Sequence, residues 1–310
     1  MTAPPPDPRG GAFFDLSERT KLRLTGRDRV RFLNGQTTND ISKATASASV
    51  AACILNVKGR LNGYVFVSAP ADCLLLDGPV ELRETLPMRL DRYVIADDVQ
   101  IEDVTDQFSL FHVLGHPVPS LSRISGIRSA NRFGSSGFDI WHPASERDDL
   151  FEELSRSIAF CDEACAETFR IEQGIPRWGR ELTEEIIPLE ANLEASCIDY
   201  QKGCYIGQEI ISRMKMSGQR NKSLCGLILV GSGTLAPGMK LVTTGAESKD
   251  AGWITSAATS SRLGLQIALA FVKRPFNQTG TQLTAFQSSA EPVDNRAEVV
   301  NLPFSPVDVK

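Results

Sequence analysis

The stretch Phe169-Arg170-Ile171-Glu172-Gln173-Gly174-Ile175-Pro176 marks the point where the character of the chain changes. Apolar spacing over residues 162–173 predicts a helix, with the glycine of this stretch as its C-cap and the proline as its stop. Residues 177–220 are polar and carry the most unusual motif of the chain. Beyond Lys222, short β-type runs alternate with Gly, Pro and Ser turns. This pattern predicts a separate C-terminal barrel or sandwich of about five or six strands.

Upstream of the predicted helix, short β-type runs alternate with short helical ones, which predicts a mixed α and β region. The first dozen residues are rich in Pro and Gly and predict a flexible tail. Residues 58–63 read Lys-Gly-Arg-Leu-Asn-Gly between two predicted strands, and their Asn-Gly pair predicts a hairpin turn. The expected organisation is a tail over 1–12, a mixed region over 13–220 and a barrel over 221–310.

The composition of the 310 residues, with 42% hydrophobic and 23% charged, is typical of globular proteins. A formal net charge of -5 argues against a dedicated nucleic-acid binder, so no direct nucleic-acid partner is expected. No apolar run approaches the roughly 18 residues of a membrane span, and the N-terminus resembles neither a signal nor a transit peptide. We therefore expect a cytoplasmic protein without a membrane partner.

The seven cysteines are scattered, with no C-x-x-C pair, and only three histidines are present: His112, His116 and His142. This argues against a disulfide framework and against a zinc module, and no metal site is expected. Most of the thiols stand in apolar strings and are interpreted as small buried hydrophobes. No Walker, Rossmann, zinc-protease or serine-hydrolase motif occurs, so the common catalytic classes lack sequence support.

The segment Lys202-Gly203-Cys204-Tyr205-Ile206-Gly207-Gln208-Glu209 places a thiol two residues after a lysine and just before a predicted helix over 206–214. An ammonium and a helix N-terminus both favour thiolate over thiol, so this geometry would lower the pKa of Cys204. Glycines on both sides would let backbone come close to a ligand. The alternative is a tight structural turn with a buried cysteine, and physical chemistry alone leaves both interpretations open.

Charges are unevenly distributed around this segment. Downstream lies a basic cluster: Arg213, Lys215, Arg220 and Lys222. Upstream lies an acidic group, interpreted by default as a solvated face: Glu181, Glu184, Glu185, Glu190, Glu194 and Asp199. A basic cluster beside a thiolate favours an anionic ligand, such as a polyglutamate tail or a phosphate.

Three motifs together carry a family resemblance. They are the stretch 169–179, the run Ile-Pro-Leu-Glu-Ala-Asn-Leu at 187–193, and the Cys204 segment. With them, the chain resembles the YgfZ family of folate-binding proteins, which is related to the aminomethyltransferase (T-protein) of the glycine cleavage system. The N-terminal run 31–40 and the β-rich tail resemble the family more loosely, so the resemblance extends over about residues 13–300.

The resemblance implies an α+β protein of T-protein type, a multi-domain ring with a ferredoxin-like subdomain and a C-terminal β-barrel. It also implies tetrahydrofolate or a derivative as cofactor. The function implied is accessory to iron-sulfur cluster assembly or repair and, through cluster enzymes, to tRNA modification. Partners would be folate and iron-sulfur client or assembly proteins.

The resemblance also implies residue roles. Cys204 would be the reactive residue, and Lys202 would tune it. Glu172 resembles the glutamate that T-proteins use toward the pterin, and Asp77, at a strand end, falls where a polar pterin contact would be expected; a strand-end aspartate with no ligand is at least as good an interpretation of Asp77. The other implied folate contacts are Gly203, Tyr205 and Arg213.

One departure from the T-protein pattern concerns activity. T-proteins carry an acidic pair in the strand after a Lys-Gly turn, whereas no Asp or Glu follows Lys58-Gly59 here. Loss of a general acid-base carboxylate costs about 10²- to 10⁴-fold in rate, so glycine cleavage activity is not expected. Two alternatives remain: a folate-dependent aminomethyl- or methyltransferase, and a scaffold whose cysteine only packs. Whether Cys204 would meet a cluster, a client thiol or a one-carbon unit stays open.

Overall fold

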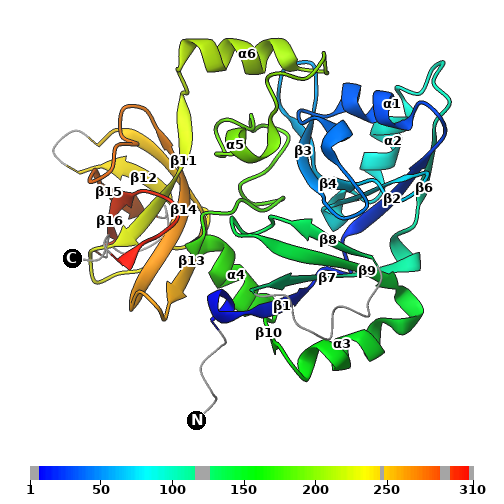
Figure 1. Cartoon of the computed structure of the whole chain (residues 1–310). Coiled ribbons are helices and arrows are strands. Elements are labelled where there is room, and N and C mark those ends of the chain that lie inside the picture. The colour runs from blue at the N-terminus through cyan, green and yellow to red at the C-terminus, as the bar shows by residue number, and fades with distance from the viewer. Residues whose placement is uncertain (1–6, 116–125, 245–247, 287–293, 307–310) are drawn as a thin grey trace. The chain divides into compact units, whose positions relative to one another are not determined.

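The computed structural model describes residues 7–115, 126–244, 248–286 and 294–306 (Figure 1). The chain divides into two compact units. The first unit comprises residues 1–166 and 194–212, and the second comprises 167–193 and 213–310. The second unit therefore contains the barrel together with residues 167–193 and 213–220, which the sequence analysis placed in the 13–220 region. The domain boundary at residue 220 stays a prediction.

The first unit contains two five-stranded sheets. One has the strand order β10-β1-β7-β9-β8, in which only β10 and β1 pair in parallel. Its strands are β1 (Ala12–Asp15), β7 (Phe108–Leu114), β8 (Ile127–Ala130), β9 (Gly137–Pro143) and β10 (Ala159–Phe160). Helix α3 (Arg147–Ser155) packs on this sheet through Leu150 and Leu154, which join a core built on Phe13 and Phe111. Strand β1 begins at Ala12 and a 3-10 turn spans Pro8–Gly10, so regular structure begins before residue 13. The flexible tail over 1–12 stays a prediction.

The second sheet of this unit is entirely antiparallel, in the order β3-β4-β5-β2-β6. Its strands are β2 (Thr20–Thr25), β3 (Val50–Leu55), β4 (Leu61–Ser68), β5 (Leu74–Gly78) and β6 (Gln100–Asp103). Helices α1 (Arg29–Gln36) and α2 (Thr85–Asp91) lie between strands of this sheet in the sequence (Figure 1). The one-turn helix α5 (Glu194–Cys197) and the longer α6 (Gln208–Ser217) follow later in the chain. Further 3-10 turns span Ile41–Lys43, Val80–Leu82, Thr105–Gln107 and Ala144–Glu146.

The hairpin between β3 and β4 turns earlier than the sequence predicted. The turn is formed at residues 56–60, where the Asn56 side chain accepts hydrogen bonds from the backbone N–H groups of Lys58 and Arg60. Gly59 supplies the positive φ of 72°, whereas the predicted Asn-Gly pair lies inside β4. The predicted hairpin is confirmed, but the Asn-Gly pair does not form its turn, because Asn56 satisfies the turn's backbone donors with its own side chain.

Helix α4 (Glu163–Glu172) ends as predicted. Gly174 has a φ of 70°, its N–H donates to Ile171 O, and the N–H of Ile175 donates to Arg170 O. This is the double hydrogen bond of a glycine C-cap in the left-handed conformation.

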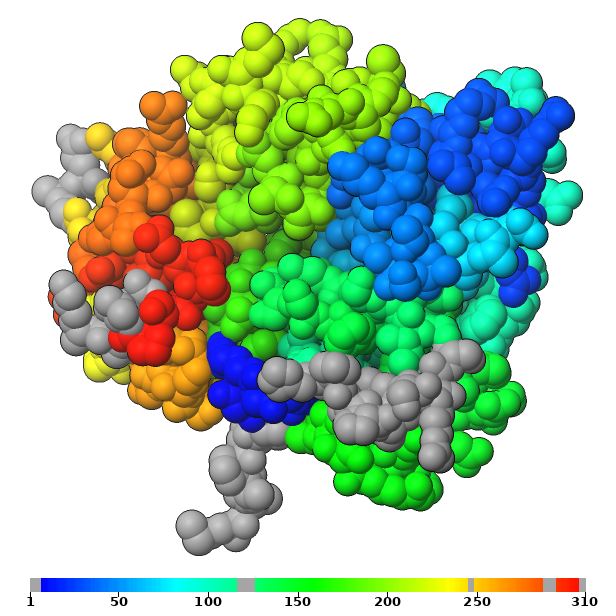
Figure 2. Space-filling view, in the orientation of Figure 1, coloured from blue at the N-terminus to red at the C-terminus, as the bar shows by residue number. Residues whose placement is uncertain are grey.

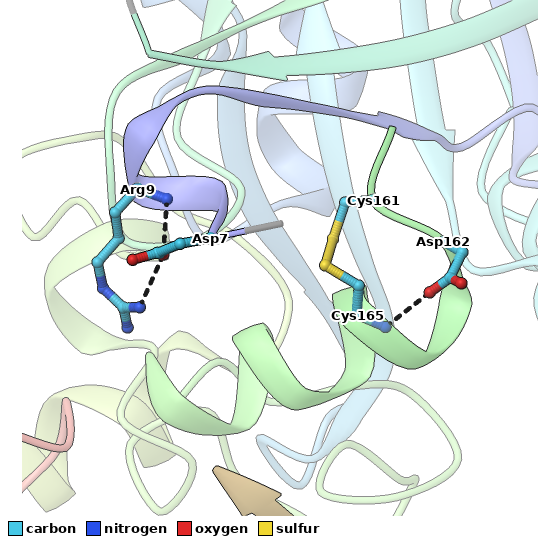
Figure 3. The surroundings of a disulfide bond; sticks show 5 residues. All are labelled: Asp7, Arg9, Cys161, Asp162 and Cys165. Atoms are coloured by element: carbon cyan, nitrogen blue, oxygen red, sulfur yellow. Dashed lines mark hydrogen bonds and ion pairs between the residues drawn. A yellow bond between two sulfur atoms is a disulfide. The ribbon is translucent and has the colours of Figure 1, made fainter. Parts of the chain in front are cut away.

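The start of α4 contains a disulfide that the argument against a disulfide framework did not foresee. Cys161 and Cys165 form a disulfide at the first turn of the helix (Figure 3). The Asp162 carboxylate accepts a hydrogen bond from the Cys165 N–H, so Asp162 caps this turn. A separation of four residues at a helix start brings two Cα atoms within 5.4 Å, which is inside the range that a disulfide spans.

The second unit is built on a closed six-stranded barrel in the order β11-β14-β13-β12-β15-β16, closed by pairing of β16 with β11. Its strands are β11 (Lys222–Leu229), β12 (Lys240–Thr243), β13 (Asp250–Ser260), β14 (Leu265–Lys273), β15 (Gln282–Phe286) and β16 (Arg296–Val300). Alternate side chains point inward to a core that includes Leu227, Leu241 and Ala270. The predicted strand number and position are confirmed.

Candidate functional site

The Cys204 segment is anchored to the C-terminal end of α1 by one partly buried ammonium. Lys202 Nζ donates to three backbone carbonyls, those of Asn34 at 2.5 Å, Thr37 at 2.6 Å and Asn39 at 2.9 Å. A cation is favoured there, because the carbonyls at a helix C-terminus lack partners and carry partial negative charge. Burial lowers the pKa of Lys202 to about 8, although the negative charges of Asp40 and Asp199 oppose the shift.

Further hydrogen bonds fix the same two chain segments together. The N–H of Ile206 donates to Gly35 O, and the N–H of Asp199 donates to Thr38 O. The Thr38 hydroxyl donates to the Cys197 carbonyl at 2.6 Å and accepts from the Cys53 N–H. Residues 197–206 are therefore held on residues 34–39 by backbone contacts at several points, and the loop has a defined conformation.

Two glycines bring the Lys-Gly turn against the start of α6. A Cβ added at Gly59 would lie 2.8 Å from Ile210 Cβ, and one added at Gly207 would lie 2.7 Å from Asn56 O. Both glycines have positive φ, 72° and 82° respectively. Only glycine combines this backbone conformation with so close an approach. The structure thus unites three sequence motifs: residues 34–40, 56–60 and 202–209.

Cys204 lies in this anchored loop as an exposed free thiol. It is the one exposed free cysteine among the described residues, so the interpretation of a buried structural cysteine is wrong. In the space-filling view, the yellow-green segment that contains it lies on the visible surface (Figure 2). Helix α6 begins four residues later, at Gln208 rather than at the predicted residue 206.

Lys202 does not donate a hydrogen bond to the Cys204 sulfur in this arrangement. An ammonium has three donors, and all three reach backbone carbonyls. Lys202 can therefore influence Cys204 only through its electrostatic field and by fixing the loop; tuning of the thiol by Lys202 stays a prediction. The two residues next to the thiol differ in exposure. Tyr205 is buried, with its ring centroid 5.1 Å from Lys202 Nζ, whereas Gly203 is exposed.

The strand that follows the Lys-Gly turn presents no carboxylate. Strand β4 reads Leu-Asn-Gly-Tyr-Val-Phe-Val-Ser over residues 61–68. Its partner strand β3 reads Val-Ala-Ala-Cys-Ile-Leu, also without an acid. The absence of an acidic pair noted in the sequence therefore extends to both strands of this hairpin.

Asp77 belongs to a buried ionic network elsewhere in the first unit. Arg132 binds both of its oxygens, at 2.6 and 3.0 Å, and Arg19 Nε donates to it at 2.5 Å. Arg132 also binds Asp139, which accepts a 2.8 Å hydrogen bond from His112 if Nδ1 carries the proton. Burial by itself would raise the pKa of Asp139, but the charge of Arg132 outweighs it and holds this pKa well below its usual range. The network joins β5 of one sheet to β9 of the other.

This network bears on the pterin contact expected of Asp77. Three N–H donors from two arginines already occupy its carboxylate, which is 1% exposed. One arginine would have to move before Asp77 could accept from a pterin. The folate role of Asp77 therefore does not fit the arrangement described, and it stays a prediction.

Glu172, at the end of α4, lies in the second unit. Its carboxylate is 4% exposed and accepts hydrogen bonds from Ser260 Oγ at 2.5 Å and Arg262 Nε at 3.1 Å. Arg213 is exposed on α6, within the second unit.

Several charged residues taken as solvent-facing are in fact paired and buried. Glu181 is fully buried and binds Arg170 and Ser256, and the 5% exposed Glu190 binds Lys222 at 3.1 Å. The default interpretation of a solvated acidic face is therefore wrong for Glu181 and Glu190. Lys222 is likewise committed to an ion pair rather than available to an anionic ligand.

Two features of the site were not foreseen from the sequence. The cradle for Lys202 consists of main-chain carbonyls, which no side-chain motif reveals, although the polar run Thr-Thr-Asn-Asp at 37–40 is a signal of it. The Arg132 network joins residues far apart in the chain, so spacing could not reveal it. His116 lies outside the described residues. Over the described ranges, no group of three or more His, Cys, Asp or Glu is placed to hold a metal ion.

Comparisons with known proteins support a T-protein relationship. Residues 222–305 match the family model for the glycine cleavage T-protein C-terminal barrel domain. Over 301 residues the chain is 24% identical to an aminomethyltransferase of Thermoanaerobacter pseudethanolicus, covering 87% of this chain and 80% of that protein. It is 34% identical to an aminomethyltransferase of Aquifex aeolicus over 150 residues, which covers 48% of this chain and 40% of that one.

The fold of the chain also matches a solved structure. The crystal structure of glycine cleavage system aminomethyltransferase T from Bartonella henselae matches with a TM-score of 0.82 at 17% identity, covering 96% of this chain and 87% of that chain. The predicted T-protein-like fold with a C-terminal barrel is therefore confirmed. No helix within the described ranges has both the length and the apolar character of a bilayer span.

Proposed function

From this relationship to the T-protein family, we propose that the chain is a tetrahydrofolate-binding protein of the YgfZ type. It assists iron-sulfur cluster assembly or repair and, through cluster enzymes, tRNA modification. Cys204 is its reactive residue. The cofactor is tetrahydrofolate or a derivative, and the partners are iron-sulfur client or assembly proteins.

The exposed Cys204 carries this proposal. A thiol that only packs is buried, whereas this one is exposed in a loop that Lys202 and the flanking hydrogen bonds hold in place. The lack of an Asp or Glu on β3 and β4 also supports the proposal, because the hairpin offers no carboxylate for general acid-base catalysis of aminomethyl transfer.

The folate part of the proposal is supported by Glu172. A buried carboxylate can bind adjacent N–H groups of a pterin, and such charge-assisted hydrogen bonds are strong. Tetrahydrofolate would supply a one-carbon carrier. The chain's own residues would bind and orient it.

Calorimetry tests folate binding separately from the thiol. We expect the wild-type chain to bind tetrahydrofolate and Cys204→Ala to bind it with similar affinity, while Glu172→Gln weakens binding about tenfold through loss of a charge-assisted hydrogen bond. Glu184→Gln, at an exposed position, serves as the matched control. Absence of binding by the wild-type chain would refute the folate part.

A cellular assay tests the thiol. We expect iron-sulfur enzyme activity to fall in cells whose only copy carries Cys204→Ala, and to stay normal with Cys73→Ala, the control at a partly buried thiol. Equal activity with both variants would rule out Cys204 as the reactive residue.

The second candidate is a folate-dependent aminomethyltransferase or methyltransferase. It is favoured by the aminomethyltransferases that match over most of this chain. It predicts multiple turnovers of an aminomethyl donor with tetrahydrofolate, measured as released amine. Turnover by the wild-type chain would replace the accessory role with this activity.

A further inference from the structure

The exposed Cys204 lies between two surface features of the first unit that none of the roles above uses. Before it in the chain, residues 198–201 line an open hollow of about 360 Å³. After it, Gly207 packs on the backbone of Asn56, in the turn between β3 and β4. Residues 201 and 207 are each three positions from Cys204, a separation that extended chain spans in about 11 Å. One partner of ordinary interface size, about 800 Å² per side, therefore covers the hollow, the thiol and the turn together.

The turn presents free positive charge. Lys58 and Arg60 are exposed, and in the described part of the chain neither side chain has an ion-pair partner. Val57, beside them, is 73% exposed, so an apolar contact is open there as well. The hydrogen bonds to Asn56 and the packing of Gly59 hold these side chains on a fixed turn. Because the net charge of the chain is -5, the turn gives the surface next to the thiol a sign opposite to that of the whole molecule.

The hollow presents an aromatic side chain. Tyr200 lines it and is 39% exposed. The two charged residues of its lining, Lys43 and Asp199, are joined by a 2.5 Å ion pair, so the hollow offers little net charge to a small ion. Small-molecule sites enclose most of their ligand, whereas tyrosine in an open surface is typical of contacts between proteins. The lining of the hollow therefore favours a protein partner.

The space next to the thiol is open to an approaching chain, because a Cβ added at Gly203 would meet nothing within 4 Å. From these features we propose that residues 57–60, the Cys204 loop and the hollow form a docking surface for an acidic segment of a partner protein. Carboxylates of that segment pair with Lys58 and Arg60. This rests on the proposed function, in which Cys204 is the reactive residue, and it names the chemical class of the protein that meets this thiol.

An anionic folate tail shares the carboxylate chemistry but accounts for less of this surface. A row of carboxylates pairs with the cations of the turn and leaves Val57 and Tyr200 uncovered. A protein segment covers the apolar and aromatic side chains too, and opposite charges speed its association with the surface.

The kinetics of thiol–disulfide exchange test the charge selectivity of this surface. The probes are the peptides Glu-Glu-Cys-Glu-Glu and Lys-Lys-Cys-Lys-Lys, each as the mixed disulfide with thionitrobenzoate. The Cys204 thiolate attacks the peptide sulfur, a disulfide between protein and peptide forms, and thionitrobenzoate leaves as a coloured thiolate, which is measured by absorbance. The rate of Cys204→Ser is subtracted, so that only Cys204 is followed. We expect the glutamate peptide to react about tenfold faster at low salt, and its advantage to shrink at high salt.

Charge-reversal variants locate the selectivity. Lys58→Glu/Arg60→Glu should remove the preference for the glutamate peptide. The matched control, Lys240→Glu/Arg274→Glu, makes the same change of charge at exposed positions of the second unit and should keep the preference. The quantity compared is the ratio of the two peptide rates, because a change in the thiolate fraction of Cys204 cancels in that ratio.

Equal rates for the two peptides, or a preference that survives Lys58→Glu/Arg60→Glu, would overturn the proposal. Loss of the preference on addition of polyglutamylated tetrahydrofolate would assign the cations to a folate tail and overturn it as well. The peptide rates are measured without folate and without an iron-sulfur client. A charge preference in a chain that fails the calorimetric and cellular tests would remove the proposed function and leave the docking surface, so the two can fail independently.

Discussion

At the scale of single residues, the buried carboxylate of Asp77 has its charge balanced by arginines rather than by solvent. Removing one partner of a buried ion pair leaves the other charge uncompensated, which costs about 3–5 kcal/mol. We expect Asp77→Asn to lower the free energy of unfolding by about that amount in urea denaturation. Asp72→Asn, at an exposed position, is the control and should change little. A stability equal to that of wild type would show that Asp77 is not a structural partner of Arg132 and Arg19.

Single residues also show what the sequence could and could not reveal about the site. The motif around Cys204 marked the thiol as unusual but left its burial open, and the structure shows that it is exposed. The partners of Lys202 could not be predicted, since they are carbonyls more than 160 residues away in the chain. The sequence therefore indicated which residues are unusual but not how each is paired.

At the scale of elements, the contact between the β3–β4 turn and α6 depends on glycine. Gly59→Ala would place a Cβ against Ile210 in a left-handed conformation, and we expect a loss of about 1–3 kcal/mol in the free energy of unfolding.

The matched substitution is Gly35→Ala in α1, where an added Cβ meets nothing within 4 Å. Because alanine favours helix over glycine, this variant should gain up to about 1 kcal/mol. In thermal unfolding, Gly59→Ala should therefore lower the Tm and Gly35→Ala should raise it. A gain in stability for Gly59→Ala would contradict the packing of the turn described here.

Elements were predictable wherever periodicity or cap chemistry decided them. Helix α4 agrees with the sequence, because the Gly-x-Pro stop determines its end locally. The apolar spacing over residues 79–91 predicts a single helix, whereas the structure has the 3-10 turn at Val80–Leu82 and then α2. Periodicity extends over both pieces and does not show the break between them.

At the scale of the whole molecule, the seven cysteines divide into one disulfide and five free thiols. Unfolded without reductant, the chain should titrate five thiols, and after reduction seven. Because the disulfide spans a separation of only four residues, its loss should lower the free energy of unfolding by no more than about 2 kcal/mol. Comparing Tm with and without reductant, in wild type and in Cys161→Ser/Cys165→Ser, checks this. If reductant also changed the Tm of the double variant, the effect of the reductant would not come from the Cys161–Cys165 disulfide.

The architecture of the whole chain was recoverable from the sequence because the barrel strands and the family motifs are both local signals. The pairing of Cys161 with Cys165 was not, since scattered cysteines without C-x-x-C gave no reason to expect it. The grouping of residues 167–193 with the barrel also depends on long-range contacts such as that between Arg170 and Ser256.

Closure of the barrel has a consequence for solubility. Pairing of β16 with β11 leaves no unsatisfied row of backbone amides along that sheet, so a neighbouring molecule cannot extend it by strand addition. The sheets of the first unit do have edge strands. One of them, β10, has only two residues and is too short to pair with a strand of another molecule. The outer sides of β3 and β8 are partly occupied by hydrogen bonds from residues 37–39 and 47–49, so strand addition to the native molecule should be easiest at β6.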